Sequence, residues 1–99
     1  MMMSKYGIFI DDEVIASDIN RLTNQLWKLI PMRENEENWI LQLDSVIVEV
    51  VGLNEIFGNK NSFLILLSKL EGLKISDTEF KVYRKTVFEA ISLLREMRL

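Results

Sequence analysis

The chain of 99 residues contains no cysteine and no histidine. Without cysteine it can form no disulfide, no thiolate nucleophile and no zinc–thiolate site. Without histidine it lacks the commonest general base, the Ser-His and Cys-His nucleophile pairs, and most ligands of transition metals. Its four scattered glycines do not form a phosphate-binding loop. We therefore expect a protein that is not an enzyme and holds no cofactor and no metal ion.

Long apolar runs are also missing. The longest, residues 63–67, is far too short to cross a bilayer. The first residues lack the long apolar region and the small-residue cleavage site of a signal peptide. The length predicts a single helical domain over 1–99, and 48% hydrophobic residues suffice for a small core. We expect a cytoplasmic protein that makes no contact with a membrane.

Residues 39–57 carry the strongest pattern in the chain. Apolar residues recur there at steps of three or four, which places them on one side of a helix. Five β-branched residues within 46–51 favour a strand instead, but a period of 2 holds for only a few residues. We therefore predict a helix whose first apolar row is Trp39, Leu43, Val46, Val50, Leu53 and Phe57.

A second row lies roughly opposite the first on the same helix. It consists of Leu41, Ser45, Val48, Gly52 and Ile56. A helix that is apolar on two sides normally has neighbours on both. Its small residues, Ser45 and Gly52, let another backbone come close. The pattern thus predicts a central helix on which the other elements pack.

Three further helices are predicted around this one, which makes the fold a small all-α antiparallel four-helix bundle with a short N-terminal arm. The first helix begins after the capping residue Asp11 and ends before Pro31, because the residue before a proline avoids helical geometry. Asn35 caps the second helix, and Gly58 ends it. The predicted bounds are 11–30, 35–57, 62–71 and 76–98.

The last two helices have different patterns. The third is apolar on nearly all sides, which predicts burial on more than one side, and Gly72 ends it. The fourth begins with the capping box Ser76-Asp77-Thr78-Glu79. Residues 1–10 form an arm or a tail, and Ile8 and Ile10, or Phe9, contact the core. The predicted core stripe of the fourth helix is Phe80, Tyr83, Val87, Ala90, Ile91 and Leu94.

More apolar residues are present than four such stripes hold. A large exposed apolar patch usually marks a partner surface, although single exposed apolar residues are normal. We therefore predict a protein–protein interaction module, such as an adaptor, inhibitor or accessory subunit, that forms a homodimer or docks on a larger protein. The surface is either the second row of residues 39–57 or the outer side of the fourth helix. The candidate partner residues are Leu41, Val48, Ile56, Val82, Phe88, Leu93 and Trp27.

Charge is unevenly distributed along the chain. Residues 1–57 carry four basic and ten acidic side chains, and residues 58–99 carry eight basic and five acidic ones. The alternative function is a subunit of a nucleoprotein complex that contacts a phosphate backbone. An overall pI of 4.9 opposes nucleic-acid binding, and a solvated basic face explains the same residues. The candidate nucleic-acid residues are Lys81, Arg84, Lys85, Arg95 and Arg98, with Phe88 among them.

Overall fold

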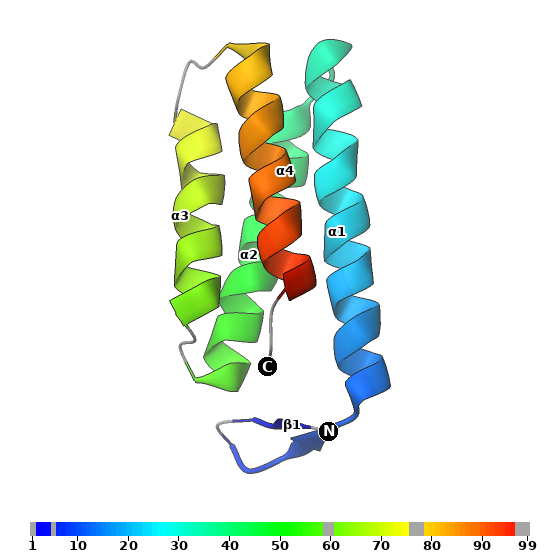
Figure 1. Ribbon diagram of the computed structural model, residues 1–99, viewed down its shortest axis with the longest axis vertical. Coiled ribbons are helices and arrows are strands. Elements are labelled where there is room, and N and C mark those ends of the chain that lie inside the picture. The colour runs from blue at the N-terminus through cyan, green and yellow to red at the C-terminus, as the bar shows by residue number, and fades with distance from the viewer. Residues whose placement is uncertain (1, 5, 59–60, 76–78, 97–99) are drawn as a thin grey trace.

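The computed structural model describes residues 2–4, 6–58, 61–75 and 79–96, and four helices account for most of them (Figure 1). The helices are α1 (Asp12–Glu34), α2 (Trp39–Phe57), α3 (Asn61–Ile75) and α4 (Phe80–Glu96). Two short strands, β1 (Met2–Met3) and β2 (Phe9–Ile10), come before them. Neighbouring helices run antiparallel along a body that measures 42 × 21 × 21 Å. The predicted all-α four-helix bundle is confirmed.

Each helix packs mainly against two others. α1 lies against α2 and α4, and α3 lies against the same two, so α2 and α4 are diagonal to each other. The prediction that 39–57 forms a central helix is therefore wrong, because α2 is one of four corners. Its first row faces the core, whereas its second row, with Leu41 and Val48, faces solvent.

One stripe from each helix fills the interior, as the periodicity predicted for α2 and α4. Trp39, Leu53 and Phe80 pack against this core while only partly buried. Burying one large aliphatic or aromatic side chain is worth about 1.5–3 kcal/mol, so the stripes supply most of the stability. The largest fully buried side chains are Tyr83, Phe63, Leu22, Leu26, Leu29, Leu43, Leu66, Leu70, Leu94, Val46, Val50 and Val87.

Tyr83 connects α4 to the adjoining ends of α1 and α2. Its hydroxyl donates a long hydrogen bond of 3.4 Å to the backbone carbonyl of Leu29. Its ring meets that of Trp39 edge-on at 5.2 Å, and the Arg33 guanidinium lies 4.3 Å from the ring centre. Burial raises the pKa of Tyr83 to about 12, although the charge of Arg33 acts in the opposite direction. The hydroxyl therefore remains a donor at neutral pH.

α1 begins as predicted but continues past Pro31. Asp11 has the extended backbone of an N-cap (φ −62°, ψ 141°), although its side chain makes no capping bond. Pro31 lies inside the helix, so the predicted end at residue 30 is wrong. A proline this close to the C-terminal end removes one helical N–H and disturbs a single turn. The helix continues because the Pro31 carbonyl still accepts a 2.9 Å bond from the Asn35 N–H, and Arg33 stacks on Tyr83.

α2 begins later than predicted. Its N-cap is Asn38, whose side chain accepts a 3.5 Å bond from the Leu41 N–H, so the assignment of Asn35 is wrong. Asn35 is instead the C-cap of α1, where its N–H donates to the Pro31 carbonyl. Glu36 takes a positive φ of 58° in the connection between the two helices. At the other end Gly58 adopts the left-handed conformation (φ 81°, ψ 46°), which confirms the predicted C-terminal glycine.

α3 is longer and more exposed than predicted. It runs past Gly72, because Leu73 is buried in the core and its burial offsets the cost of a helical glycine, about 1 kcal/mol. The predicted end at residue 71 is wrong. The prediction of burial on more than one side is also wrong, because Leu64 and Ile65 are both exposed. α3, like α2, has one buried stripe and an apolar outer side.

α4 begins at Phe80 rather than near the predicted capping box. The Glu79 carbonyl accepts the first helical bonds from the N–H groups of Val82 and Tyr83, both at 3.0 Å. Glu79 therefore stands before the helix, whereas a cap at Ser76 requires it inside, so the predicted start is wrong. Ser76 itself and residues 97–98 at the predicted end lie outside the described residues.

The N-terminal arm folds into a two-stranded antiparallel hairpin in which Met2 pairs with Ile10 and Met3 with Phe9. The Ser4 hydroxyl oxygen accepts bonds from the N–H groups of Tyr6 and Ile8, and Gly7 supplies the positive φ of 77° that the turn requires. Ile10 packs against the core as predicted, whereas the core contact predicted for Ile8 together with it is wrong. Ile8 and Phe9 are exposed, because the hairpin stands below the bundle (Figure 1).

Leu66 and Leu64 offer a matched test of the α3 assignment. Leu66→Ala removes a fully buried side chain and should lower the free energy of unfolding by about 2–5 kcal/mol in urea denaturation. Leu64→Ala makes the same change on the exposed side and should stay within about 0.5 kcal/mol of wild type. Equal losses from the two variants would contradict the single buried stripe of α3.

Candidate interaction surfaces

The second apolar row of α2 is the first candidate surface, and we call Leu41, Ser45, Val48 and Gly52 the α2 outer row. Leu41 is 66% exposed and Val48 is 70% exposed. Ser45 and Gly52 are exposed too, and a Cβ added at Gly52 would meet nothing within 4 Å. Apolar residues with this much exposure, in a row along one helix, form the kind of patch that marks a partner surface.

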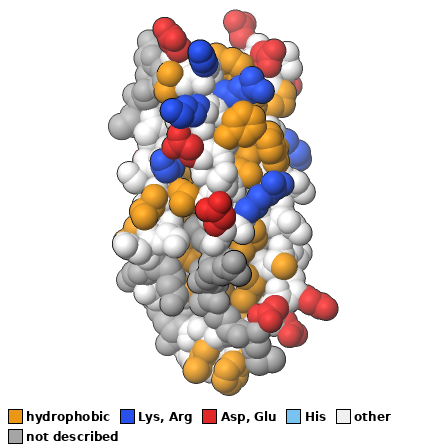
Figure 2. All heavy atoms as spheres, in the orientation of Figure 1, with side chains coloured by type: hydrophobic (Ala, Val, Ile, Leu, Met, Phe, Trp, Pro, Cys, Tyr) orange, Lys and Arg blue, Asp and Glu red, His pale blue; other side chains and the backbone are white. Residues whose placement is uncertain are grey.

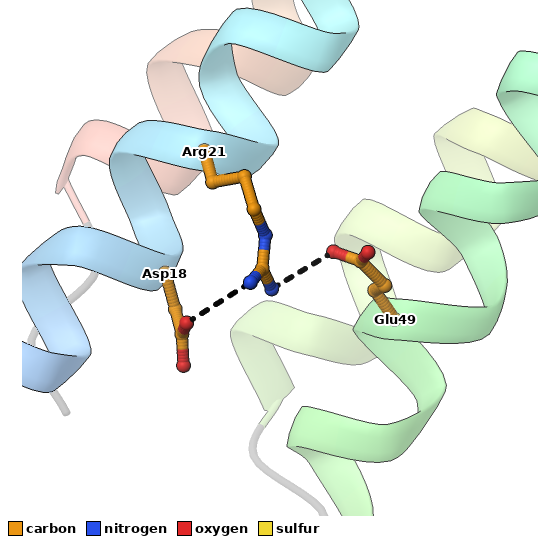
Figure 3. Close-up of polar contacts among 3 residues, drawn as sticks. All are labelled: Asp18, Arg21 and Glu49. Carbon is orange, nitrogen blue, oxygen red and sulfur yellow. Dashed lines mark hydrogen bonds and ion pairs between the residues drawn. The ribbon is translucent and has the colours of Figure 1, made fainter.

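Ion pairs border the α2 outer row on the side of α1. The Arg21 guanidinium lies 3.1 Å from the Glu49 carboxylate and 3.5 Å from that of Asp18, which joins α1 to α2 (Figure 3). About two turns earlier in α2, the Gln42 side-chain amide donates a 3.4 Å bond to the backbone carbonyl of Gln25. This edge of the row is therefore polar, and its acids have a cation from the same chain.

The edge toward α3 is more apolar. Asp44 forms a 2.8 Å ion pair with Lys74 of α3, and this contact raises the pKa of the lysine above its usual value. Ile40 and Val51 are 44% and 45% exposed. Because Ile40 is one turn before Asp44 and Val51 is two turns after it, both lie on the same edge as Asp44. These two residues were not among the predicted partner residues, although they extend the α2 outer row sideways.

The outer side of α4 is the second candidate surface, on the diagonally opposite corner of the bundle. A hollow of about 570 Å³ runs along it, with Lys69 of α3 on one side. Lys81, Arg84 and Lys85 gather in this hollow, as predicted for the basic face. In Figure 2 lysine and arginine side chains surround apolar ones on the upper half of this face. The full lining is Lys69, Lys81, Arg84, Lys85, Phe88, Glu89, Ser92, Leu93 and Glu96.

The predicted aromatic residues meet beside this hollow. Phe88 contacts Trp27 of α1 edge-to-face, with the ring centres 5.0 Å apart, and the Arg84 guanidinium lies 5.3 Å from the Phe88 ring centre. Trp27 is 39% exposed, so one side of the aromatic pair is open to solvent. The cation thus lies over the partly buried ring of Phe88, and the more exposed ring of Trp27 is the one on which a planar ligand can stack.

Acidic side chains moderate the charge of the hollow. Glu89 forms a 2.8 Å ion pair with Lys69, and this cation lowers the pKa of the Glu89 carboxyl. Glu96 lies exposed at the lower end of the hollow. Arg95 is exposed in the last turn of α4, where a cation also favours the helix end, and Arg98 lies outside the described residues.

The predicted partner residues fall on two sides of the bundle, which correspond to the two alternative surfaces on α2 and α4. Leu41 and Val48 lie on α2, with the half-exposed Ile56 at its α1 edge. Val82 is exposed on α4, whereas Leu93 packs against the core and contributes only its edge to the hollow. Periodicity predicted the side of the helix on which each residue lies, but it did not predict how the helices are arranged around one another.

A second, smaller cavity of about 220 Å³ lies between the start of α1 and the end of α2. Its lining is apolar except for Asp18, which faces Arg21. The residues are Ile10, Val14, Ile15, Asp18, Ile19, Leu53, Ile56 and Phe57. The sequence signal for it was the predicted contact of Ile10 with the core.

No protein-family model, curated protein or solved structure matches this chain. Over the described ranges, no three His, Cys, Asp or Glu side chains come close enough together to hold a metal ion. Within the same residues, no helix has the length and apolar character needed to span a membrane. The class that the structure defines is a small all-α four-helix bundle with an apolar row on one corner and a basic hollow on the opposite one.

Lys69 should control the titration of Glu89. Lys69→Met removes the cation and should raise the pKa of the Glu89 carboxyl toward its usual value, as followed by carboxyl-carbon NMR. Because the folded pKa is the lower one, the pair stabilises the fold above the unfolded pKa and loses this effect as the pH falls through the folded value. Lys74→Met, which removes the cation of a different interhelical pair, should leave the Glu89 titration unchanged.

Proposed function

We propose that this protein is a non-enzymatic protein–protein interaction module that self-associates through the outer side of α2. The observation that supports the proposal is the exposure of Leu41 and Val48 in a row that no helix of the described residues covers. A cytoplasmic adaptor or accessory subunit is the corresponding cellular role.

A second copy of the chain fits the α2 outer row better than an oppositely charged partner. The acids along its two edges, Glu49 and Asp44, already have cations in Arg21 and Lys74. Because both acids are already paired, they do not require a basic partner. The same edge of a second copy is therefore not strongly repelled. A two-fold interface that buries the same row on both copies is the commonest arrangement in soluble homo-oligomers.

Val48→Glu should weaken this association. It places two carboxylates in an apolar interface, and we expect the dissociation constant of the dimer to rise at least about tenfold, which corresponds to 1.4 kcal/mol. Sedimentation equilibrium across the micromolar range measures the change. The folded state should persist, since Val48 is exposed in the single chain.

The matched control is Val82→Glu, the same change at an exposed valine on the diagonally opposite helix. It should leave the dissociation constant unchanged. A wild-type chain that remains monomeric up to several hundred micromolar would exclude self-association. A dimer that Val82→Glu breaks and Val48→Glu does not would move the interface to α4.

The hollow on α4 supports a second candidate function, a subunit of a nucleoprotein complex. Three cations, Lys81, Arg84 and Lys85, converge on one hollow beside the aromatic pair of the exposed Trp27 and the partly buried Phe88. Cations that follow a phosphate backbone, next to rings on which bases stack, are the usual elements of single-strand binding. The neighbouring acid Glu89 is held by Lys69 and therefore opposes an anionic ligand less than a free carboxylate does.

Lys85→Glu tests this candidate against Lys28→Glu, the same change at an exposed lysine on α1, outside the hollow. Lys85→Glu should abolish retention of a single-stranded RNA or DNA oligonucleotide at low salt, because it reverses a charge in the hollow. Lys28→Glu should weaken it much less. Absence of retention by the wild-type chain at low salt would exclude the candidate.

A further inference from the structure

We propose that two copies pair through α2 in antiparallel orientation, with Leu41 of each copy packed on Gly52 of the other and Ser45 packed on Val48. This inference rests on the proposed self-association and adds its orientation and register. The two-fold axis then crosses α2 at the level between residues 46 and 47.

The order of side-chain sizes along α2 favours the antiparallel orientation of the two copies. The outer row reads large, small, large, small, from Leu41 through Ser45 and Val48 to Gly52, at steps of 4, 3 and 4 residues. These are the steps of a two-stranded helical seam. Reversing the row on the second copy sets each large side chain opposite a small one, so the two surfaces interdigitate.

A parallel pair in register lacks this fit. Leu41 then meets Leu41, and Val48 meets Val48, while Ser45 and Gly52 face their own copies. The large pairs hold the helices apart and leave voids at the small pairs, which forfeits dispersion contacts. The open space beside Gly52 is filled only when the helix of the second copy runs the other way.

The two edges of the row favour the same orientation. Antiparallel pairing about this axis brings the α3 edges of both copies together and the α1 edges together. Val51 of one copy then lies near Ile40 of the other, which covers two residues that are about half exposed in the single chain. A parallel pair sets this apolar edge against the polar α1 edge, with its Arg21–Glu49 ion pair.

Charges are also compatible with this register. Glu49 of one copy lies at the level of residue 44 of the other, on the opposite edge from Asp44. The two Glu49 carboxylates are thus offset by about five residues, or about 7.5 Å along the helix, and each stays beside its own Arg21. Antiparallel helices additionally oppose their dipoles.

The outer side of α4 from a second copy is a poorer partner for the α2 outer row than α2 itself. The middle of that side carries Lys81, Lys85, Ser92 and Glu96, none of which can bury Leu41 or Val48 without losing water. A head-to-tail contact of α2 on α4 would also be heterologous and would produce a ring or an open filament rather than a two-fold dimer.

Disulfide cross-linking tests the register, since the chain has no cysteine of its own. Leu41→Cys and Gly52→Cys are prepared as separate variants and oxidised alone and as an equimolar mixture. We expect the mixture to yield at least tenfold more covalent dimer than either variant alone. In this arrangement the two residues 41 of the dimer lie about 16 Å apart along the helix axis, which is too far for a disulfide. Mass spectrometry of the linked peptides identifies the 41–52 bond.

Three results decide the outcome. Efficient cross-linking of Leu41→Cys with itself overturns the inference in favour of a parallel pair. A dimer that sediments normally under reducing conditions but forms no 41–52 bond overturns the register while the proposed function stands. A wild-type chain that never dimerises overturns both. Val82→Cys on α4 serves as the control and gives the yield from random collision.

Discussion

The bundle depends on the limited number of neighbours that each helix has. In a ring of four, a helix touches two others and hides one stripe of side chains between them. The buried stripe of α2 extends from Leu43 to Phe57, and that of α4 extends from Tyr83 to Leu94. Any further apolar residue must therefore lie outside. The exposure of Leu41 and Val48 follows from this geometry, not from poor packing of the core.

Ion pairs add a second level of organisation. Arg21 joins α1 to α2, Lys74 joins α3 to α2, and Lys69 joins α3 to α4. All three are partly exposed, and such pairs contribute little to the free energy of unfolding. Their main effect is on the charge of the two candidate surfaces. The acids Asp44 and Glu49 beside the α2 outer row are compensated, whereas Lys81 and Lys85 stand in the α4 hollow.

The two candidate surfaces thus differ in kind. The α2 outer row is apolar and regular, while the α4 hollow is lined by cations and acids around Phe88 and Leu93. Because they occupy diagonal corners, a dimer formed through α2 leaves both α4 hollows open on its outer sides. Self-association and binding of a polyanion are therefore compatible within one assembly. Avidity from two hollows would strengthen such binding without any new contact.

The sequence by itself determined the number of helices, the stripe that each of α2 and α4 buries, and the turn at Gly58, because these depend on periodicity and local backbone preference. It misjudged Pro31 and Gly72 as helix ends, since tertiary contacts of Arg33 and Leu73 offset small local penalties. Only the tertiary structure decided that the second row of α2 is exposed. It also decided that Trp27 contacts Phe88 and that Glu89 forms an ion pair with Lys69. Spacing along one helix gives the direction of a side chain from its own axis, but the position of the other helices decides whether that direction leads to the core or to water.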